Sequence, residues 1–178
     1  MKPIYLGSLY SENDVEDIWN DIPWIRVAPR DECWMNNYNL EYTYGEGRGM
    51  RTYQPVELTS FVQSILDDVN DRIGSDLDVC FINGYRDSKD QLGWHSDDSP
   101  EVSSDHPIAV VSFGAEREIW TRLIGSTGMV PPQDRYLLEH GSVFVMPSGF
   151  QEVCQHRIPK HSADCGKRIS LTFRKYKS

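Results

Sequence analysis

The sequence has no long hydrophobic run. None of its 178 residues lies in an apolar stretch of the roughly 18 residues that a membrane-spanning helix requires. The first residues include no apolar segment of the length found in secretory signals. Cysteine is also scarce, and the four thiols lack the paired spacing of a disulfide framework, so we expect them to be reduced. These absences predict a soluble protein with no membrane partner, located in the cytoplasm or, in a eukaryote, the nucleus.

Positive charge is in the minority. Lys and Arg number 18 against 27 Asp and Glu, and the formal net charge of −9 argues against a protein that coats nucleic acid regardless of sequence. Arg48, Arg51 and a group of cations in the C-terminal quarter are compatible with a local basic surface, and equally with an ordinary solvated mixture of charges. Repeats and linkers are absent too, so residues 1–178 are expected to form a single domain and a monomer.

Two helices are expected in the first half of the chain. Ser11-Glu12-Asn13-Asp14 resembles a capping box that opens a short helix through Trp19, and apolar residues at helical spacing predict a second helix over residues 56–73. The pattern then changes to short β-rich runs over residues 79–85, 108–113, 118–123, 135–138, 142–146 and 168–176. Helices followed by many short strands predict an α+β chain in which helices back a β-sandwich or barrel.

Residues 38–52 are rich in Tyr, Gly and Arg. This composition predicts a mobile surface hairpin, a kind of segment that often carries substrate contacts. The spacing Gly45-x-Gly47-x-Gly49 resembles a phosphate-binding loop. It follows no strand–helix unit, however, so we interpret these glycines as a source of flexibility in the hairpin.

His95 and Asp97 lie two residues apart, and His156 follows far downstream. Two imidazoles and one carboxylate can occupy one face of an octahedral iron and leave the other face free for substrate and oxygen. A His-x-Asp pair alone arises often by chance, so the surrounding pattern carries the argument. In the last strand-like segment, Arg168 and Arg174 alternate with apolar residues and therefore share its polar face. Inside a barrel they would require an anion such as a dicarboxylate, whereas on an edge strand they would reach solvent.

These residues, in their order and spacing, resemble the AlkB family of Fe(II)/2-oxoglutarate-dependent nucleic-acid dealkylating dioxygenases. The resemblance extends from about Pro29 to Tyr176. Each motif is weak alone, but the set is specific. Its members are Asn83-x-Tyr85, His95-x-Asp97, His156 and Arg168-x5-Arg174, with the segments Ser112–Ala115 and His140–Ser142.

The resemblance implies a double-stranded β-helix (jelly roll) fold that uses Fe(II), 2-oxoglutarate and O2. By the same resemblance, the iron is held by His95, Asp97 and His156. Arg168 would pair with the distal carboxylate of 2-oxoglutarate and Arg174 would lie near the carboxylate beside the keto group, with further contacts from Asn83, Tyr85 and Ser170. Six residues of straight strand span roughly 20 Å, so both arginines reach one ligand only if the strand coils or their side chains converge.

The implied activity is oxidative dealkylation of N-alkylated bases in DNA or RNA, such as 1-methyladenine and 3-methylcytosine, with release of aldehyde, succinate and CO2. The base must be single-stranded or flipped out of a duplex to reach buried iron. Tyr44 is the candidate to stack on the base, and a tyrosine that only packs the hairpin is equally consistent. Arg48 and Arg51 are candidates for phosphate contacts. Trp94 is expected to be a wall of the substrate pocket or a core residue.

Two positions depart from the family pattern. Many members have an acidic residue that reads the target base where this chain has Ser99, and Asp98 is the candidate to replace it. Some relatives have Asn in place of Ser170, whose hydroxyl reaches less far. The resemblance therefore leaves the preferred base open.

Other functions are also compatible with the residues. They are an oxygenase that acts on a protein or small molecule, a non-catalytic nucleic-acid-binding jelly roll with a vestigial metal site, and a cupin-like metal isomerase. The isomerase would not need the two arginines. A separate zinc site could be formed by Cys154, His156, His161 and Cys165, but the spacing of these residues fits no familiar zinc finger.

Overall fold

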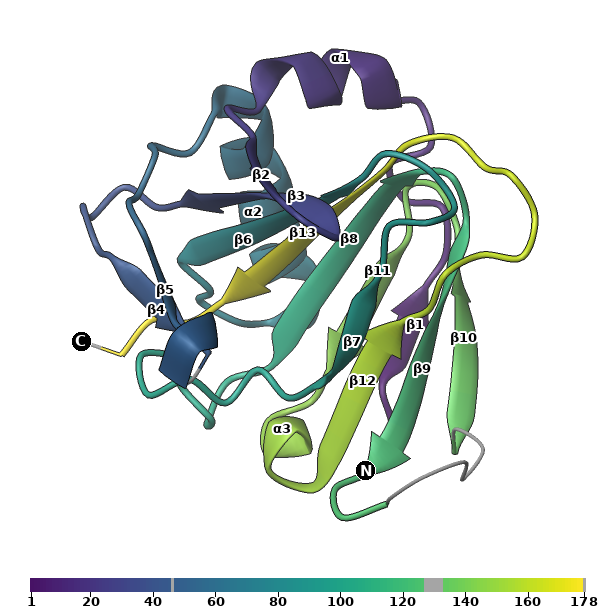
Figure 1. The fold of residues 1–178 in the computed structure, drawn as a ribbon. Helices are drawn as coiled ribbons and strands as arrows, with labels where there is room; N and C mark the ends of the chain where they lie inside the picture. The colour runs from purple at the N-terminus through teal and green to yellow at the C-terminus, as the bar shows by residue number, and fades with distance from the viewer. Residues whose placement is uncertain (46, 127–132, 178) are drawn as a thin grey trace.

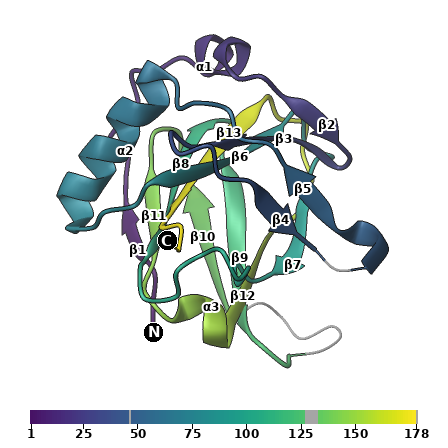
Figure 2. The same ribbon diagram turned by 90° about the vertical axis from the view of Figure 1, so that its left-hand side faces the viewer.

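The computed structural model describes residues 1–45, 47–126 and 133–177. It contains two facing antiparallel β-sheets, with helices packed on the outside of the larger sheet (Figures 1 and 2). The larger sheet has the spatial order β1 (Ile4–Leu6), β11 (Val143–Met146), β8 (Ile108–Gly114), β13 (Arg168–Arg174), β6 (Val79–Tyr85), β3 (Arg30–Met35) and β2 (Ile25–Val27). The smaller sheet has the order β10 (Asp134–Leu138), β9 (Arg117–Leu123), β12 (Cys154–Ile158) and β7 (Leu92–His95).

This architecture confirms the predicted α+β class and the jelly roll backed by N-terminal helices. One hydrophobic core lies between the helices and the larger sheet, and a second lies between the two sheets. The alternation along β13 divides its side chains between them. Its apolar residues Ile169, Leu171 and Phe173 belong to the core under the helices, so the polar face of β13 is directed to the space between the sheets.

The predicted strands from residue 79 onward are present with small shifts at their ends. Residues 79–85 form β6, and the segment predicted as 168–176 ends as a strand at Arg174. The sequence patterns missed several short strands, namely β1, β2, β3, β7 and β12. The predicted hairpin is present as β4 (Tyr42–Tyr44) paired with β5 (Arg51–Tyr53), and Glu46 of this segment lies outside the described residues.

Both helices begin later than predicted. The first, α1 (Val15–Asp21), is capped by Asp14, whose Oδ1 accepts hydrogen bonds from the backbone N–H groups of Glu16 and Asp17, so the capping box at Ser11 was wrong. The second, α2 (Ser60–Ile73), is capped by the Thr59 hydroxyl. The predicted start at residue 56 was wrong because Val56 pairs with Met35 in an isolated β-bridge.

The end of α2 and a further short helix complete the description. The chain leaves α2 through Gly74, whose φ of 63° is a left-handed conformation that glycine adopts without a steric penalty. The short helix α3 (Phe150–Val153) immediately precedes β12. Among the described residues, no helix is long and apolar enough to cross a membrane.

Candidate metal centre and co-substrate cavity

The sheet pairing of the smaller sheet brings two distant histidines together. His95, at the end of β7, is the direct register partner of His156 in β12. Their ring centroids are 4.2 Å apart. Asp97 follows β7, and its carboxylate oxygens lie 3.5 Å from Nε2 of His95 and 3.8 Å from Nε2 of His156. The ligand atoms of these three residues lie within 4.8 Å of one another, and no other His, Cys, Asp or Glu cluster of this kind occurs among the described residues. His161 and Cys165 therefore do not form the separate zinc site considered above.

Two side chains orient the Asp97 carboxylate and its backbone. Nη2 of Arg174 donates to Oδ1 of Asp97 at 2.8 Å, and the Asp97 backbone N–H donates to Oε1 of Gln151 at 2.9 Å. Burial raises the pKa of Asp97, but Arg174 and the two neighbouring imidazoles lower it by more, so the net pKa lies below its usual range. The carboxylate is therefore ionised at neutral pH and available as an anionic ligand.

The two imidazoles are also prepared for a metal. Nδ1 of His95 lies 2.9 Å from the Gly93 carbonyl oxygen, so donation of its proton to that oxygen leaves Nε2 free as a ligand. Burial and the neighbouring His95 lower the pKa of His156 to about 3. His156 is therefore neutral near pH 7, the form that coordinates a metal.

A cavity between the sheets is lined by these three ligands. It runs along the polar face of β13, from Arg174 beside Asp97 to Arg168 beside Tyr85. This explains how two arginines six residues apart on one strand serve a single site. Arg174 already bonds to Asp97 and to the Tyr42 hydroxyl, so it acts on the metal-ligand end of the cavity.

Arg168 occupies the far end and is fully buried. Its Nη2 donates to the Ser112 hydroxyl at 3.0 Å, whereas its Nε and Nη1 have no hydrogen-bond partner among the described residues. Burial lowers its pKa to about 10, which still leaves it protonated at neutral pH. A buried cation with two unsatisfied donors is costly unless an anion meets it.

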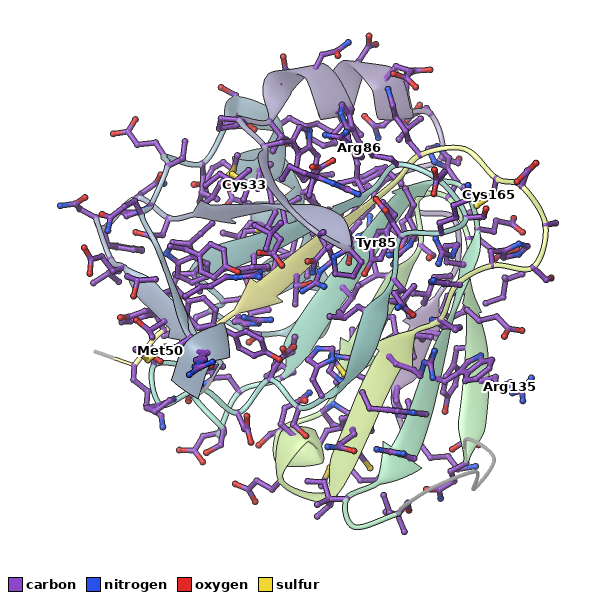
Figure 3. The ribbon with its side chains drawn as sticks, viewed as in Figure 1. Cys33, Met50, Tyr85, Arg86, Arg135 and Cys165 are labelled. Carbon is purple, nitrogen blue, oxygen red and sulfur yellow. The ribbon has the colours of Figure 1, made fainter. Side chains whose placement is uncertain are left out.

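The other predicted co-substrate residues line the same cavity. Asn83, Tyr85 and Ser170 are buried there. Figure 3 shows Tyr85 in the interior beside β7, and its ring lies 5.0 Å from the guanidinium of Arg168. The Asn83 amide oxygen accepts a hydrogen bond from Nε of Arg30 at 2.8 Å, which fixes the orientation of the amide.

These residues fit ferrous iron and a dicarboxylate co-substrate. The donor set of two neutral imidazoles and one carboxylate is the facial set of non-haem Fe(II) enzymes. The unsatisfied donors of Arg168 match a carboxylate at the other end of the cavity. His95, Asp97 and His156 would hold the metal, and the cavity beyond them would hold the co-substrate.

The predicted substrate residues fall into two groups. Tyr44 and His95 line the same opening above the metal ligands, and Asp98 lines an adjoining groove with them. Arg48 and Arg51 are exposed in the hairpin, where Arg51 is the register partner of Tyr44, and neither arginine lines the opening or the groove. The substrate-binding roles of Tyr44, Asp98, Arg48 and Arg51 stay predictions.

Trp94 is not brought into the opening. It lies on β7 next to His95, and because neighbours on a strand point to opposite faces, its ring lies on the outside of the smaller sheet. There the guanidinium of Arg122 stacks 4.3 Å from it.

The sequence patterns missed several residues of the site. Arg30 and Glu32 of β3 line the opening and pair with each other at 2.8 Å, and Tyr53 donates a hydrogen bond to Glu32. Tyr42 lies on the same strand face as Tyr44, and its hydroxyl lies 2.8 Å from the Ser99 hydroxyl. Arg30 and Glu32, and likewise Tyr42 and Tyr44, lie two residues apart, the spacing of side chains on one face of a strand. This spacing could have identified them, but the acidic residues of β3 made that segment look unlike a strand.

A jelly roll that gathers an open His/Asp/His set and a buried arginine between its sheets belongs to the class of non-haem iron oxygenases with a 2-oxo acid co-substrate. The comparison with protein families agrees. Residues 26–174 match the model of the 2OG-Fe(II) oxygenase superfamily, and the chain belongs to that superfamily and, within it, to the AlkB family.

Similarity to known proteins supports the family assignment. The chain is 30% identical to the bovine alpha-ketoglutarate-dependent dioxygenase alkB homolog 3 over 97% of this chain and 64% of that protein. It is 32% identical to the human DNA oxidative demethylase ALKBH2 over 83% of this chain and 57% of that protein. The solved structure of OsALKBH1 shares the fold, with a TM-score of 0.70 at 17% identity over 97% of each chain. The chain thus spans between half and two thirds of the curated relatives named here.

Proposed function

We propose that this protein is an Fe(II)- and 2-oxoglutarate-dependent enzyme that oxidatively dealkylates N-alkylated bases in DNA or RNA. One observation carries the proposal: the His/Asp/His set and the unsatisfied donors of buried Arg168 share one cavity. The relatives support the reaction class, since two are named as an alkB homolog dioxygenase and a DNA oxidative demethylase.

When bound, ferrous iron and 2-oxoglutarate supply the oxidation of the alkyl carbon by O2, with release of aldehyde, succinate and CO2. The residues of the chain perform the other tasks. Arg168 binds a carboxylate of the co-substrate, and Arg174 holds the Asp97 carboxylate in its ligand orientation. Burial of these groups keeps water from the reacting atoms.

The opening beside His95 fits an unpaired base. Tyr44 and His95 line it from the hairpin and from β7, so a base can lie between two flat rings. A base within a duplex cannot enter such an opening, so the target is single-stranded or flipped. Ser99 and Asp98 both line the groove, but Ser99 is buried with its hydroxyl bonded to Tyr42, whereas Asp98 is exposed. Asp98 is therefore the group that accepts a hydrogen bond from the target base.

The test is formation of succinate and aldehyde with oligonucleotides that carry 1-methyladenine or 3-methylcytosine, in DNA and in RNA. We expect methylated oligonucleotides to stimulate succinate release by the wild type and by His161→Ala, an exposed histidine outside the site. His156→Ala should be inactive. Succinate that no oligonucleotide stimulates would instead indicate a protein or small-molecule substrate, and no turnover with any substrate would contradict an oxygenase.

A further inference from the structure

The outer face of the smaller sheet carries alternating arginine and tryptophan side chains from all four of its strands. The guanidinium of Arg122 lies 4.3 Å from the Trp94 ring, and that of Arg135 lies 4.4 Å from the Trp120 ring. Arg157 lies between the two rings, 5.6 Å from Trp94 and 5.3 Å from Trp120. We call these five residues the Arg–Trp ladder. It crosses the sheet from β7 through β12 and β9 to β10.

The charge of this face opposes that of the whole chain. The strand register places one acidic residue beside the ladder, Glu118, and its carboxylate accepts a hydrogen bond from the Trp120 indole N–H at 2.6 Å. Within the described part of the chain, Arg122, Arg135 and Arg157 form no ion pair, although the sequence has a net charge of −9. Three cations without a carboxylate partner make this face locally basic.

The position of the arginines over the tryptophan rings leaves them able to bind an anion. A guanidinium that contacts an aromatic face through its central carbon keeps N–H donors available at its edges. Arg122 uses two of them on the Gln155 amide oxygen, at 3.0 and 2.8 Å. Arg135 is exposed, and its side chain points outward from β10 in the view of Figure 3. Planar donors held at fixed positions match the oxygens of phosphate groups.

The ladder is continuous with the opening of the active site. Gln155, which Arg122 holds, also lines the groove that contains Tyr44, His95 and Asp98. A polymer whose base lies between Tyr44 and His95 can therefore continue across β12 and β9 over the ladder. Aromatic faces interleaved with cations are the surface that single-stranded nucleic acids bind, because each nucleotide offers both a base and a phosphate.

We propose that the Arg–Trp ladder binds the phosphate backbone of single-stranded nucleic acid next to the base in the active site. This inference rests on the proposed function and extends it. It names a single strand as the substrate and the outer face of the smaller sheet as the surface along which that strand binds. The ladder explains how an acidic protein holds a polyanion: the binding charge is confined to one face.

The experiment compares binding of an unmodified, fluorescein-labelled single-stranded oligonucleotide by anisotropy at increasing salt concentrations. The ladder variant is Arg122→Gln/Arg135→Gln/Arg157→Gln. The control is Arg72→Gln, an exposed arginine on α2. We expect the ladder variant to bind about tenfold more weakly at low salt, with a salt slope reduced by about 2 for three lost phosphate contacts. The control should bind like the wild type.

Two further measurements keep the result interpretable. Thermal unfolding shows whether the triple variant folds, and the single variant Arg135→Glu, at an exposed position, should weaken binding in the same direction. Turnover of a methylated trinucleotide, too short to reach across the ladder, should be equal in wild type and ladder variant. Equal oligonucleotide affinity and equal salt slopes for the wild type, the folded ladder variant and the control would overturn the inference.

The inference and the proposed function can fail separately. Unmodified oligonucleotide binding requires no chemistry, so ladder-dependent binding without any dealkylation would reject the proposed function alone. Dealkylation of a methylated trinucleotide with ladder-independent binding would reject the ladder alone. Binding of an acidic peptide through the ladder, with no binding of the oligonucleotide, would assign this face to a protein partner and overturn the inference.

Discussion

At the scale of single residues, Arg168 says most about what this protein binds. A fully buried guanidinium with two unsatisfied nitrogens is unfavourable in a folded chain, and burial already lowers its pKa to about 10. A residue of this kind persists when a bound anion compensates its charge. The burial of Arg168 is therefore a signature of function more than of stability.

Arg168→Met should separate binding from folding. Loss of charge-assisted hydrogen bonds worth about 1.5–3 kcal/mol should raise the KM for 2-oxoglutarate roughly 10- to 100-fold. The free energy of unfolding without co-substrate should be unchanged or higher, because an uncompensated buried charge is removed. Steady-state kinetics and denaturant unfolding measure the two effects. A KM equal to that of the wild type would contradict the assignment of Arg168 as the carboxylate-binding residue.

His156 should make the metal-free protein sensitive to acid. An unfolded histidine takes up a proton near pH 6.5, whereas folded His156 does so only near pH 3. Between these values the unfolded state binds more protons, so the free energy of unfolding should fall as the pH is lowered from 6.5 toward 3. Unfolding in denaturant across this range, compared between wild type and His156→Gln, isolates the effect. Identical pH slopes in the two proteins would show that His156 does not contribute in this way.

At the scale of secondary structure elements, the sequence predicted what local patterns determine. Strands such as β6 and β13 are buried runs of alternating or β-branched residues, and their limits were close. By contrast, β3 contains buried Asp31 and Glu32. Asp31 pairs with Arg86, which follows β6, and Glu32 pairs with Arg30 of β3 itself and accepts a hydrogen bond from Tyr53 of the hairpin. The partners that follow β6 and lie in the hairpin are not visible in the local pattern of β3, so this strand was missed.

Helix α1 offers a test of which residue caps it. Asp14→Ala removes a side chain that accepts two backbone hydrogen bonds, and should lower the free energy of unfolding by about 1 kcal/mol. The matched control is Ser11→Ala, at the position that the sequence pattern favoured, and it should have little effect. Chemical denaturation of both variants decides between the two caps, and a larger loss for Ser11→Ala would contradict the structure.

The packing of α1 against the larger sheet depends on a glycine of β6. A Cβ added at Gly84 would lie 2.8 Å from ring atoms of Trp19 and Trp24, closer than side chains pack. Gly84→Ala should therefore cost about 1–3 kcal/mol of stability through overpacking. Gly166→Ala, where a Cβ meets nothing within 4 Å, is the control and should be nearly neutral. Thermal or denaturant unfolding measures both, and equal stabilities would contradict the close approach of these rings.

At the scale of the whole molecule, the site exists only because the sheets pair distant segments. The sequence identified all three candidate metal ligands and the two arginines, but their meeting depends on the register between β7 and β12 and on the facing of the two sheets (Figures 1 and 2). The opening residues Arg30, Glu32 and Tyr42 were missed for the same reason. Their relation to His95 is entirely non-local.

Uptake of ferrous iron tests the central claim most directly. Anaerobic titration of the metal-free protein with Fe(II), followed by calorimetry, should give one bound ion per chain for the wild type and for His161→Ala. His95→Ala and His156→Ala should each lose this binding. A wild type that takes up no iron, or a His156→Ala variant that binds iron as well as the wild type does, would contradict the account.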